Sequence, residues 1–212
     1  MLLVALTGNY GMGKSTVLSL FKKFGVFTLD ADEIVDSIFR RKKILEKIRQ
    51  LMGDSVFHDN GSLNKKKVAE IIFRNALLRR SVEDVLHPFV FKKIKDLLEK
   101  MNINDKILIV AVPLVYERAY EDKFDKTIVV HTTEEISLHR LGIKGVSRRD
   151  ALLRLKTQMP IEEKMKRADF LINNDGTLNE TKAQVEKLLK NLLRKAGDGD
   201  NQRTRRTKRK LS

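Results

Sequence analysis

The chain contains no cysteine, which excludes disulfide bonds and metal sites built on thiolates. Its four histidines are not spaced as the ligands of a zinc site are. Long hydrophobic runs are absent too, because the most apolar stretch, residues 107–112, is far shorter than a membrane-spanning helix. The first residues lack the basic region, apolar segment and cleavage site of a secretion signal. We therefore expect a cytoplasmic protein without a membrane partner.

The sequence carries a large excess of positive charge. Lysine and arginine together number 43 against 28 aspartates and glutamates, which gives a net charge of +15. This balance suits a protein whose ligands carry phosphates, and it also admits a nucleic-acid-binding protein. No nucleic-acid motif is recognisable, however, and aromatic residues are not interleaved with the basic ones. We do not expect a nucleic-acid partner.

The 212 residues, of which 42% are hydrophobic, are enough for one sizeable α/β core with an insertion. Six of the basic residues fall within residues 203–210, where apolar side chains are almost absent. We predict that residues 198–212 form a disordered basic tail. The sequence leaves the oligomeric state open.

A phosphate-binding motif begins close to the N-terminus. Residues 8–15 read GNYGMGKS and fit G-x-x-x-x-G-K-[ST] at every fixed position. An apolar run precedes the motif and an amphipathic run follows it, which disfavours a plain turn. Inward-pointing backbone N–H groups and the next helix's positive end would hold phosphates, with Lys14 on the β- and γ-phosphates and Ser15 on Mg²⁺. The predicted ATP-binding residues here are Gly11, Met12, Gly13, Lys14, Ser15 and Thr16.

Four further strands are predicted, at residues 26–29, 107–112, 127–131 and 168–172. The second of these is the most apolar and β-branched, so we predict that it is the central strand of a parallel sheet. Acidic residues follow two of the strands: Asp30 and Asp32 follow the first, and Glu117 lies beyond Pro113 after the second. Because ligands bind at the carboxyl ends of parallel strands, we expect these side chains to line one crevice. The alternative for the aspartates is to cap the next helix.

Residues 173–176 form a turn after the last strand, at the same edge of the predicted sheet. This loop, with Asn174 and Gly176, fits a nucleotide base, and the alternative is an ordinary turn. Between the strands, residues 33–102 show helical periodicity and no convincing strand, which predicts a helical insertion. His87 and Pro88 are expected to separate two helical runs within it. Taken alone, His87 favours a capping or core role over ligand binding.

A basic segment with paired glycines follows the fourth strand. Thr132 and Glu135 fit a capping box for a helix that residues 142–145 then break. Arginines and lysines such as Arg140 and Lys144 surround the break, where they could compensate the charge of a transferring phosphoryl group. We predict a mobile lid within about residues 138–160. The alternative is a helix-turn-helix with a solvated basic face.

With these motifs in place, the chain resembles the dephospho-coenzyme A kinases, relatives of the adenylate-type P-loop kinases. The phosphate loop alone is shared with many NTPases, but the order and spacing of the other motifs are more specific. The resemblance runs from residue 1 to about residue 195. Its motifs are Leu6-Thr7-Gly8 with the phosphate loop, Asp30-Ala31-Asp32, Leu86-His87-Pro88, Val112-Pro113 through Tyr116-Glu117, Gln158-Met159-Pro160, and Ala168-Asp169 through Asn174 to Gly176.

The resemblance implies a three-layer α/β P-loop NTPase fold with a five-stranded parallel sheet. It implies transfer of the ATP γ-phosphate to the ribose 3′-hydroxyl of dephospho-coenzyme A, the last step of coenzyme A synthesis. The core would comprise residues 1–32 and 103–197, the insertion at residues 33–102 would hold the acceptor, and the flap would act as a lid. An alternative is a kinase of nucleosides or nucleoside monophosphates on the same scaffold.

Residue roles also follow from the resemblance. Thr7 would lie beside the acceptor, Asp32 would orient the acceptor hydroxyl or act as its base, and Arg140 would be the lid arginine. His87, Pro113 and Glu117 would shape the acceptor pocket. The sequence departs from the family where Lys144-Gly145 replaces an arginine-aspartate pair, because lysine keeps the charge but loses bidentate geometry. Larger residues than usual in the phosphate loop, including its tyrosine, are expected to have little effect.

Overall fold

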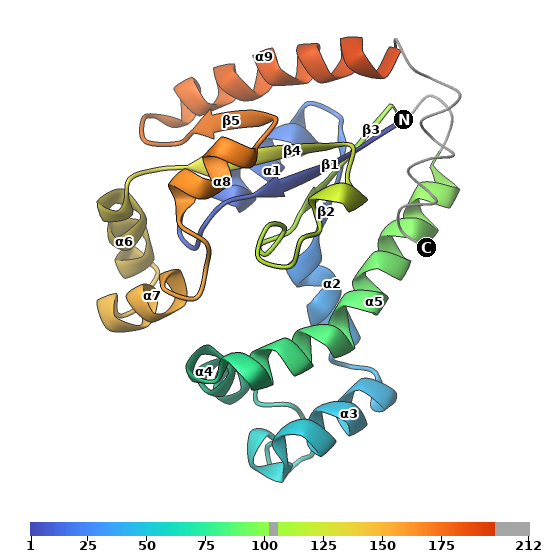
Figure 1. The fold of residues 1–212 in the computed structure, drawn as a ribbon, viewed down its shortest axis with the longest axis vertical. Helices are drawn as coiled ribbons and strands as arrows, with labels where there is room; N and C mark the ends of the chain where they lie inside the picture. The colour runs from blue at the N-terminus through green and yellow to red at the C-terminus, as the bar shows by residue number, and fades with distance from the viewer. Residues whose placement is uncertain (102–105, 198–212) are drawn as a thin grey trace. The chain divides into compact units, whose positions relative to one another are not determined.

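The computed structural model describes residues 1–101 and 106–197. The predicted basic tail at residues 198–212 therefore lies outside the described residues. The chain divides into two compact units: one contains residues 1–31 and the described residues from 98 onward, and the other contains residues 32–97. Figure 1 follows the chain through both units by colour.

A sheet of five parallel strands forms the centre of the first unit, in the order β2-β3-β1-β4-β5. The strands are β1 (Leu2–Thr7), β2 (Phe27–Asp30), β3 (Ile107–Ala111), β4 (Lys126–His131) and β5 (Phe170–Asn173). The prediction of a five-stranded parallel α/β sheet is confirmed. The prediction that residues 107–112 form the central strand is wrong, because β1 occupies the centre and β3 lies between β1 and β2. Burial of both faces shows that a strand is interior and covered, and it does not fix the position of that strand in the sheet.

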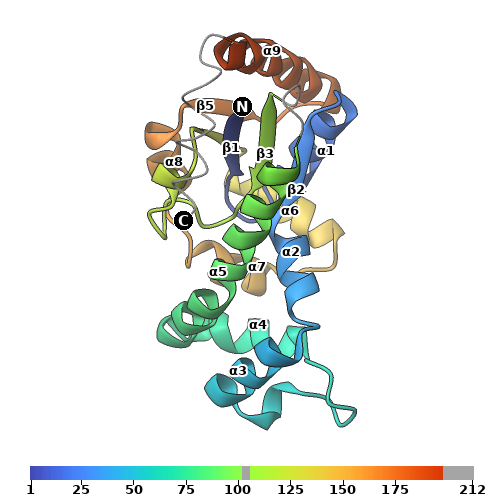
Figure 2. The ribbon, with the colours of Figure 1, turned by 90° about the vertical axis from the view of Figure 1, so that its right-hand side faces the viewer.

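Helices cover both faces of this sheet. Alternate residues of β1, such as Leu2, Val4 and Leu6, pack against α1 (Lys14–Lys23) and α9 (Leu178–Gly197), which contact each other. On the opposite face, α8 (Ile161–Arg167) contacts β4. Figure 2, turned by 90°, shows α8 and α1 on opposite sides of the sheet. The period of two along β1 therefore supplies apolar side chains to both layers, and each fully buried aliphatic side chain contributes about 1.5–3 kcal/mol.

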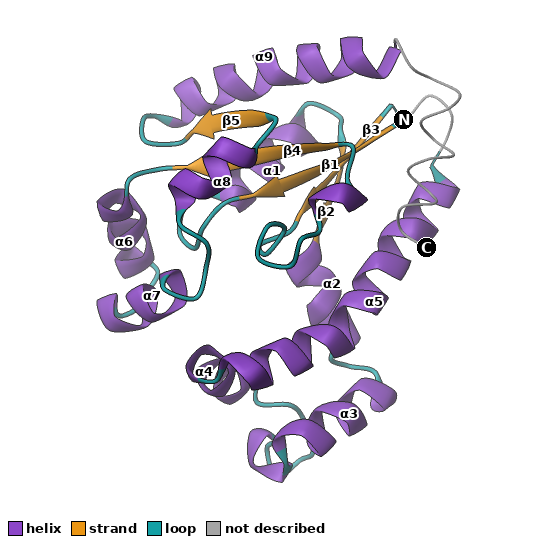
Figure 3. Cartoon of the chain, viewed as in Figure 1, coloured by secondary structure: helices purple, strands orange, loops and turns teal. Residues whose placement is uncertain are grey.

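The second unit is helical, as Figure 3 shows by its lack of strand colour. Its elements are α2 (Ala31–Ile38), α3 (Lys42–Met52), the 3₁₀-helix η1 (Asp54–Val56), α4 (Lys65–Arg74) and most of α5 (Ala76–Lys100). Across the described residues 33–101, the one strand-like feature is an isolated bridge between Phe57 and Leu63. None of the described helices is both long enough and apolar enough to cross a membrane.

The prediction that His87 and Pro88 separate two helical runs is wrong. Helix α5 passes through Pro88 without interruption. Proline removes one backbone donor from a helix, but here apolar residues recur at every fourth position and are buried on one face. These residues are Val82, Leu86, Val90, Ile94 and Leu98. Burial of this stripe outweighs the lost hydrogen bond.

Two short helices form the predicted lid segment, α6 (Glu134–Ile143) and α7 (Arg148–Leu155). The capping box was placed one residue early: Thr133 is the N-cap, and its hydroxyl accepts from Ile136 N at 3.3 Å. The Thr132 hydroxyl instead donates to Asp175 Oδ1 at 2.6 Å, which takes it away from the helix end. The break also comes later than predicted, because α6 continues through Gly142 and ends before Gly145, whose φ is 77°.

Candidate functional site

The loop between β1 and α1 forms a cradle that admits only glycine at certain positions. Gly13, the N-cap of α1, has φ 92°, and a Cβ there would lie 2.1 Å from Asn174 Nδ2. At Gly8 a Cβ would lie 2.2 Å from the Val130 carbonyl oxygen. The close backbone approach and the amino end of α1 together suit the phosphate groups of ATP. Lys14 Nζ folds back over this loop and donates to the Gly8 carbonyl at 2.9 Å.

Within the cradle the predicted residues differ in what they offer a ligand. Met12 is buried, and its backbone N–H already donates to Asn9 O at 3.2 Å. Ser15 and Thr16 are exposed in the first turn of α1, so their hydroxyls are accessible. Met12 therefore shapes the loop, whereas Ser15 and Thr16 face outward.

Asn174 and Arg140 close one side of the cradle. Asn174 Nδ2 donates to the Met12 carbonyl at 3.0 Å, and Arg140 Nη2 donates to the Asn174 carbonyl at 2.9 Å. The second terminal nitrogen of the guanidinium, Nη1, is buried and has no hydrogen-bond partner among the described residues. A buried cationic donor left unpaired is costly, so this nitrogen is suited to an anionic ligand. The structure thus brings Arg140 and Asn174 to Met12 and Gly13, from which both lie far away in the sequence.

Helices α6 and α7 contact the phosphate loop through Tyr10. Ser137 Oγ, on α6, donates to the Tyr10 carbonyl at 2.7 Å. The ring packs against a small apolar cluster of the two helices that contains Leu138, Leu141 and Ala151. From the sequence, we expected the large residues of this loop to have little effect. The aromatic side chain of Tyr10 is the feature of the sequence that could have indicated this contact.

Thr7 contacts the segment that follows β3, to which Pro113 and Glu117 belong. Thr7 is fully buried, and its hydroxyl donates to the Pro113 carbonyl at 3.1 Å. Glu117 Oε1 lies 2.7 Å from Lys164 Nζ, and Lys164 on α8 is itself fully buried. Burial lowers the pKa of the Lys164 ammonium, and the Glu117 carboxylate opposes that shift. Sequence reasoning missed Lys164, because a lysine in a mostly charged helix carries no sign of burial.

The loop between α7 and α8 completes the surroundings of the phosphate loop. Asn9 Nδ2 donates to the Met159 carbonyl at 3.0 Å, and Tyr10 N donates to Gln158 Oε1 at 2.8 Å. Met159 N in turn donates to Glu117 Oε1 at 3.0 Å. These contacts connect the phosphate loop with the acidic residue after β3.

The remaining predicted residues lie elsewhere. Asp30 ends β2, two strands from β1, which corresponds to roughly 10 Å across the sheet. Asp32 follows in the first turn of α2, and it belongs with His87 to the second unit. Lys144 is exposed at the C-cap of α6. Gly176 lies beside the capping residues of α9, where an added Cβ would meet Glu180 Oε2 at 2.2 Å.

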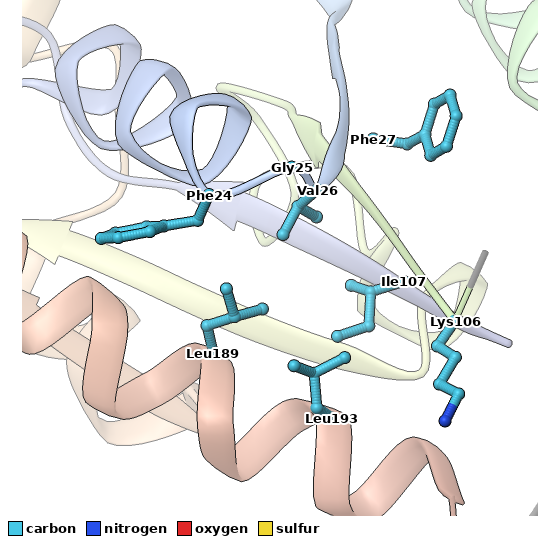
Figure 4. A pocket seen from close by; sticks show the side chains of 8 residues that line it. All are labelled: Phe24, Gly25, Val26, Phe27, Lys106, Ile107, Leu189 and Leu193. Atoms are coloured by element: carbon cyan, nitrogen blue, oxygen red, sulfur yellow. The ribbon is translucent and has the colours of Figure 1, made fainter. Parts of the chain in front are cut away.

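A separate cavity of about 330 Å³ lies at the amino ends of β2 and β3, away from the phosphate loop at the carboxyl end of β1. Figure 4 shows Phe24 and Val26 beside Leu189 and Leu193 of α9, with Lys106 and Ile107 at the start of β3. None of the predicted site residues lines this cavity. Within the described residues, no group of three or more histidine, aspartate or glutamate side chains gathers to hold a metal ion.

Comparisons with known proteins agree on one family. A family model described as dephospho-CoA kinase matches residues 2–180. A dephospho-CoA kinase of Aquifex aeolicus is 35% identical over 192 residues, which cover 90% of this chain and 97% of that protein. A dephospho-CoA kinase of Bacillus licheniformis is also 35% identical, over 89% of this chain and 95% of that protein. These matches confirm the resemblance seen in the motifs.

Solved structures show the same fold. TT1252 from Thermus thermophilus matches with a TM-score of 0.79 and 29% identity, covering 91% of this chain and 97% of that one. The dephospho-CoA kinase from Campylobacter jejuni matches with a TM-score of 0.63 and 25% identity, covering 90% and 96%. A shikimate kinase from Bacteroides thetaiotaomicron reaches a TM-score of 0.51 at 17% identity, covering 91% and 98%, which shows a shared fold alone.

Proposed function

The chain belongs to the dephospho-CoA kinase family, and from that premise we propose that it transfers the γ-phosphoryl group of ATP to the ribose 3′-hydroxyl of dephospho-coenzyme A. The products are coenzyme A and ADP. The observation that supports this most is the glycine cradle at the amino end of α1, bordered by a buried guanidinium nitrogen of Arg140 that has no partner among the described residues. Phosphoryl transfer needs positioning and charge compensation, which such a site supplies.

On the donor side, the backbone of residues 11–16 would hold the phosphates of ATP. Lys14 would leave the Gly8 carbonyl and neutralise the charge that develops on the transferred group. Arg140 would add its buried Nη1 donor, with Asn174 holding the guanidinium in place through its carbonyl. Gly176 and Lys144 are proposed as outer contacts to the nucleotide.

Mg²⁺ is proposed as the metal of the reaction. The exposed hydroxyl of Ser15 offers one oxygen ligand, and nucleotide phosphates and water would supply the rest, as is usual for this ion. When bound, the ion neutralises phosphate charge and orients the phosphates.

On the acceptor side, Asp32 is proposed to orient the 3′-hydroxyl and accept its proton late in the transfer. Thr7, Pro113 and Glu117 would form one wall of the acceptor site. The second unit, with His87, is proposed as the acceptor-binding insertion. Because the co-substrate is ATP, we propose a cytoplasmic location.

The test is ADP formation from ATP and Mg²⁺ with one acceptor at a time: dephospho-coenzyme A, AMP, CMP, shikimate or none. We expect ADP and a product heavier by one phosphoryl group only with dephospho-coenzyme A, and phosphorus NMR of that product should show a 3′-phosphate. Transfer to AMP or CMP instead would contradict the proposal and identify a nucleoside monophosphate kinase.

A further inference from the structure

Lys164 carries a charge where the fold excludes water. Its side chain is 0% exposed, and its partner Glu117 is 14% exposed. Nζ lies 2.7 Å from Glu117 Oε1 and 3.5 Å from the Pro113 carbonyl. Such a buried ion pair is weak evidence for stability, because apolar residues of similar volume are often as good or better in its place. The presence of this ion pair therefore points to a role in positioning the groups that the Glu117 carboxylate binds.

The carboxylate holds the loop that touches the phosphate loop. Glu117 Oε1 accepts from Met159 N at 3.0 Å, and the Met159 carbonyl accepts from Asn9 Nδ2 at 3.0 Å. One residue away, Gln158 Oε1 accepts from Tyr10 N at 2.8 Å. A series of hydrogen bonds thus runs from the ammonium of Lys164 through Glu117 and Met159 to Asn9, and the neighbouring Gln158 binds Tyr10.

A second connection starts from the same ammonium. Lys164 Nζ reaches the Pro113 carbonyl, which also accepts from the hydroxyl of Thr7, the residue directly before the phosphate loop. In addition, Glu117 Oε2 is buried and has no hydrogen-bond partner among the described residues. Since Oε1 already serves Lys164 and Met159, Oε2 is the oxygen left for a donor group of a ligand.

We propose that Lys164 is a positioning residue that couples occupancy of the acceptor side to the geometry of the phosphate loop. The inference rests on the proposed function, in which Glu117 borders the acceptor. With the ammonium in place, Glu117 keeps one orientation and holds residues 158–159 against Asn9 and Tyr10. An acceptor that donates to Glu117 Oε2 reinforces this arrangement, so acceptor and ATP each raise the affinity of the site for the other.

The experiment compares three variants of the full chain with the wild type. Lys164→Met removes the buried ammonium at similar volume. Lys166→Met is the matched control, because Lys166 lies on the same helix in an ion pair with Glu163 but is 71% exposed. The double variant Lys164→Met/Glu117→Gln leaves no unpaired buried charge and guards against a single variant that does not fold.

Affinity for a non-hydrolysable ATP analogue is measured by calorimetry with and without saturating dephospho-coenzyme A, alongside kcat, KM and thermal unfolding. In the wild type and in Lys166→Met we expect the acceptor to raise nucleotide affinity about 5-fold or more. In Lys164→Met this factor should fall to about 1, and kcat should fall about 10-fold or more with a much smaller change in the KM for ATP. The double variant should regain thermal stability without regaining the coupling.

Each other outcome overturns the inference. A folded Lys164→Met protein with wild-type coupling and kcat, or a double variant that recovers both stability and coupling, shows the pair to be structural only. Equal nucleotide affinity with and without acceptor in the wild type leaves nothing for Lys164 to couple. If the wild type transfers no phosphate to dephospho-coenzyme A, the proposed function fails and this inference fails with it; wild-type transfer with unaltered coupling in Lys164→Met refutes the inference alone.

Discussion

The guanidinium of Arg154 lies over the ring of Tyr10, 4.8 Å from its centroid, and its Nη1 donates to the Tyr10 hydroxyl at 3.0 Å. Tyr10 belongs to the phosphate loop, and Arg154 lies near the end of α7. Together with the hydrogen bond from Ser137 to the Tyr10 carbonyl, this contact attaches both α6 and α7 to the loop. The position of these two helices, the predicted lid, is therefore linked to a side chain that the phosphate-binding motif does not specify.

Removing the ring should loosen α7. A cation–π contact contributes about 0.5–1 kcal/mol at an exposed site and a hydrogen bond about 0.5–1.5 kcal/mol, so Tyr10→Ala should raise the KM for ATP roughly 5-fold or more. Tyr10→Phe keeps the ring and loses only the hydroxyl. Its effect on the KM for ATP, expressed as a free energy, should be about half that of Tyr10→Ala. Hydrogen exchange of residues 148–155 measures the loosening directly. Equal exchange in the wild type and both variants would contradict a role for Tyr10 in holding the lid.

Gly13 should be indispensable for nucleotide binding, and Gly25 provides its control. Both have positive φ, 92° and 77°, so alanine at either position meets similar backbone strain, about 1–2 kcal/mol. Only at Gly13 would the new Cβ also clash with Asn174 Nδ2. At Gly25, nothing lies within 4 Å of an added Cβ. Gly13→Ala should lower affinity for an ATP analogue by about 10-fold or more, and Gly25→Ala should leave it unchanged. Wild-type affinity in Gly13→Ala would contradict the requirement for glycine, and an equal loss in both variants would assign the effect to backbone strain instead of the closeness of Asn174.

The candidate site could be predicted from the sequence where its geometry is local. The phosphate loop is an example, because glycine spacing and a following helix fix the cradle within a few residues. Asn174 and Arg140 were predicted near the nucleotide from their segments and from the resemblance, but the contacts of Asn174 with Met12 and of Arg140 with Asn174 depend on the crossover connections of the sheet. Lys164 lacked any local signal, since its burial depends on Glu117, a distant residue in another loop.

The fold was predictable in type but not in arrangement. Strand composition indicated a parallel sheet, yet the order of β1 and β3 is set by how the whole chain winds and not by the residues of one strand. Pro88 was misjudged because a local rule about proline competed with an apolar stripe along all of α5. The sequence predicted Thr132 as the cap of α6, but its hydroxyl donates to Asp175, which follows β5, and Thr133 caps the helix instead.

Asp32 is expected to act on the transfer step. Asp32→Asn should lower kcat by about 10²–10⁴-fold, as loss of a general base does, while affinity for the ATP analogue stays within about 3-fold. Asp36→Asn is the control, because Asp36 lies on the same helix, is exposed, and pairs with Lys65 at 2.5 Å. Steady-state kinetics and calorimetry of both variants provide the comparison. Turnover of Asp32→Asn at the wild-type rate would assign the acceptor hydroxyl to another group.

Asp175 should make part of the stability depend on pH in the acid range. Hydrogen bonds from the Thr132 hydroxyl at 2.6 Å and from Thr133 N at 2.9 Å hold the pKa of this carboxyl below its usual value of 3.8. Because the folded protein binds this proton less readily than the unfolded chain, the contribution is fully present above that value and is lost as pH falls through the lower folded pKa.

The variant Asp175→Asn removes the titrating group but keeps one amide oxygen as an acceptor for Thr132. Urea unfolding of the wild type and the variant, from about pH 6 down to about pH 2, should give a shallower loss of stability for the variant. The difference between the two proteins should be largest near neutral pH and shrink in acid, since there the wild-type carboxyl is protonated as well. Parallel curves across the whole range would mean that the two threonine contacts do not favour the ionised form of Asp175. The connection between the ends of β4 and β5 would then not depend on the charge of this carboxyl.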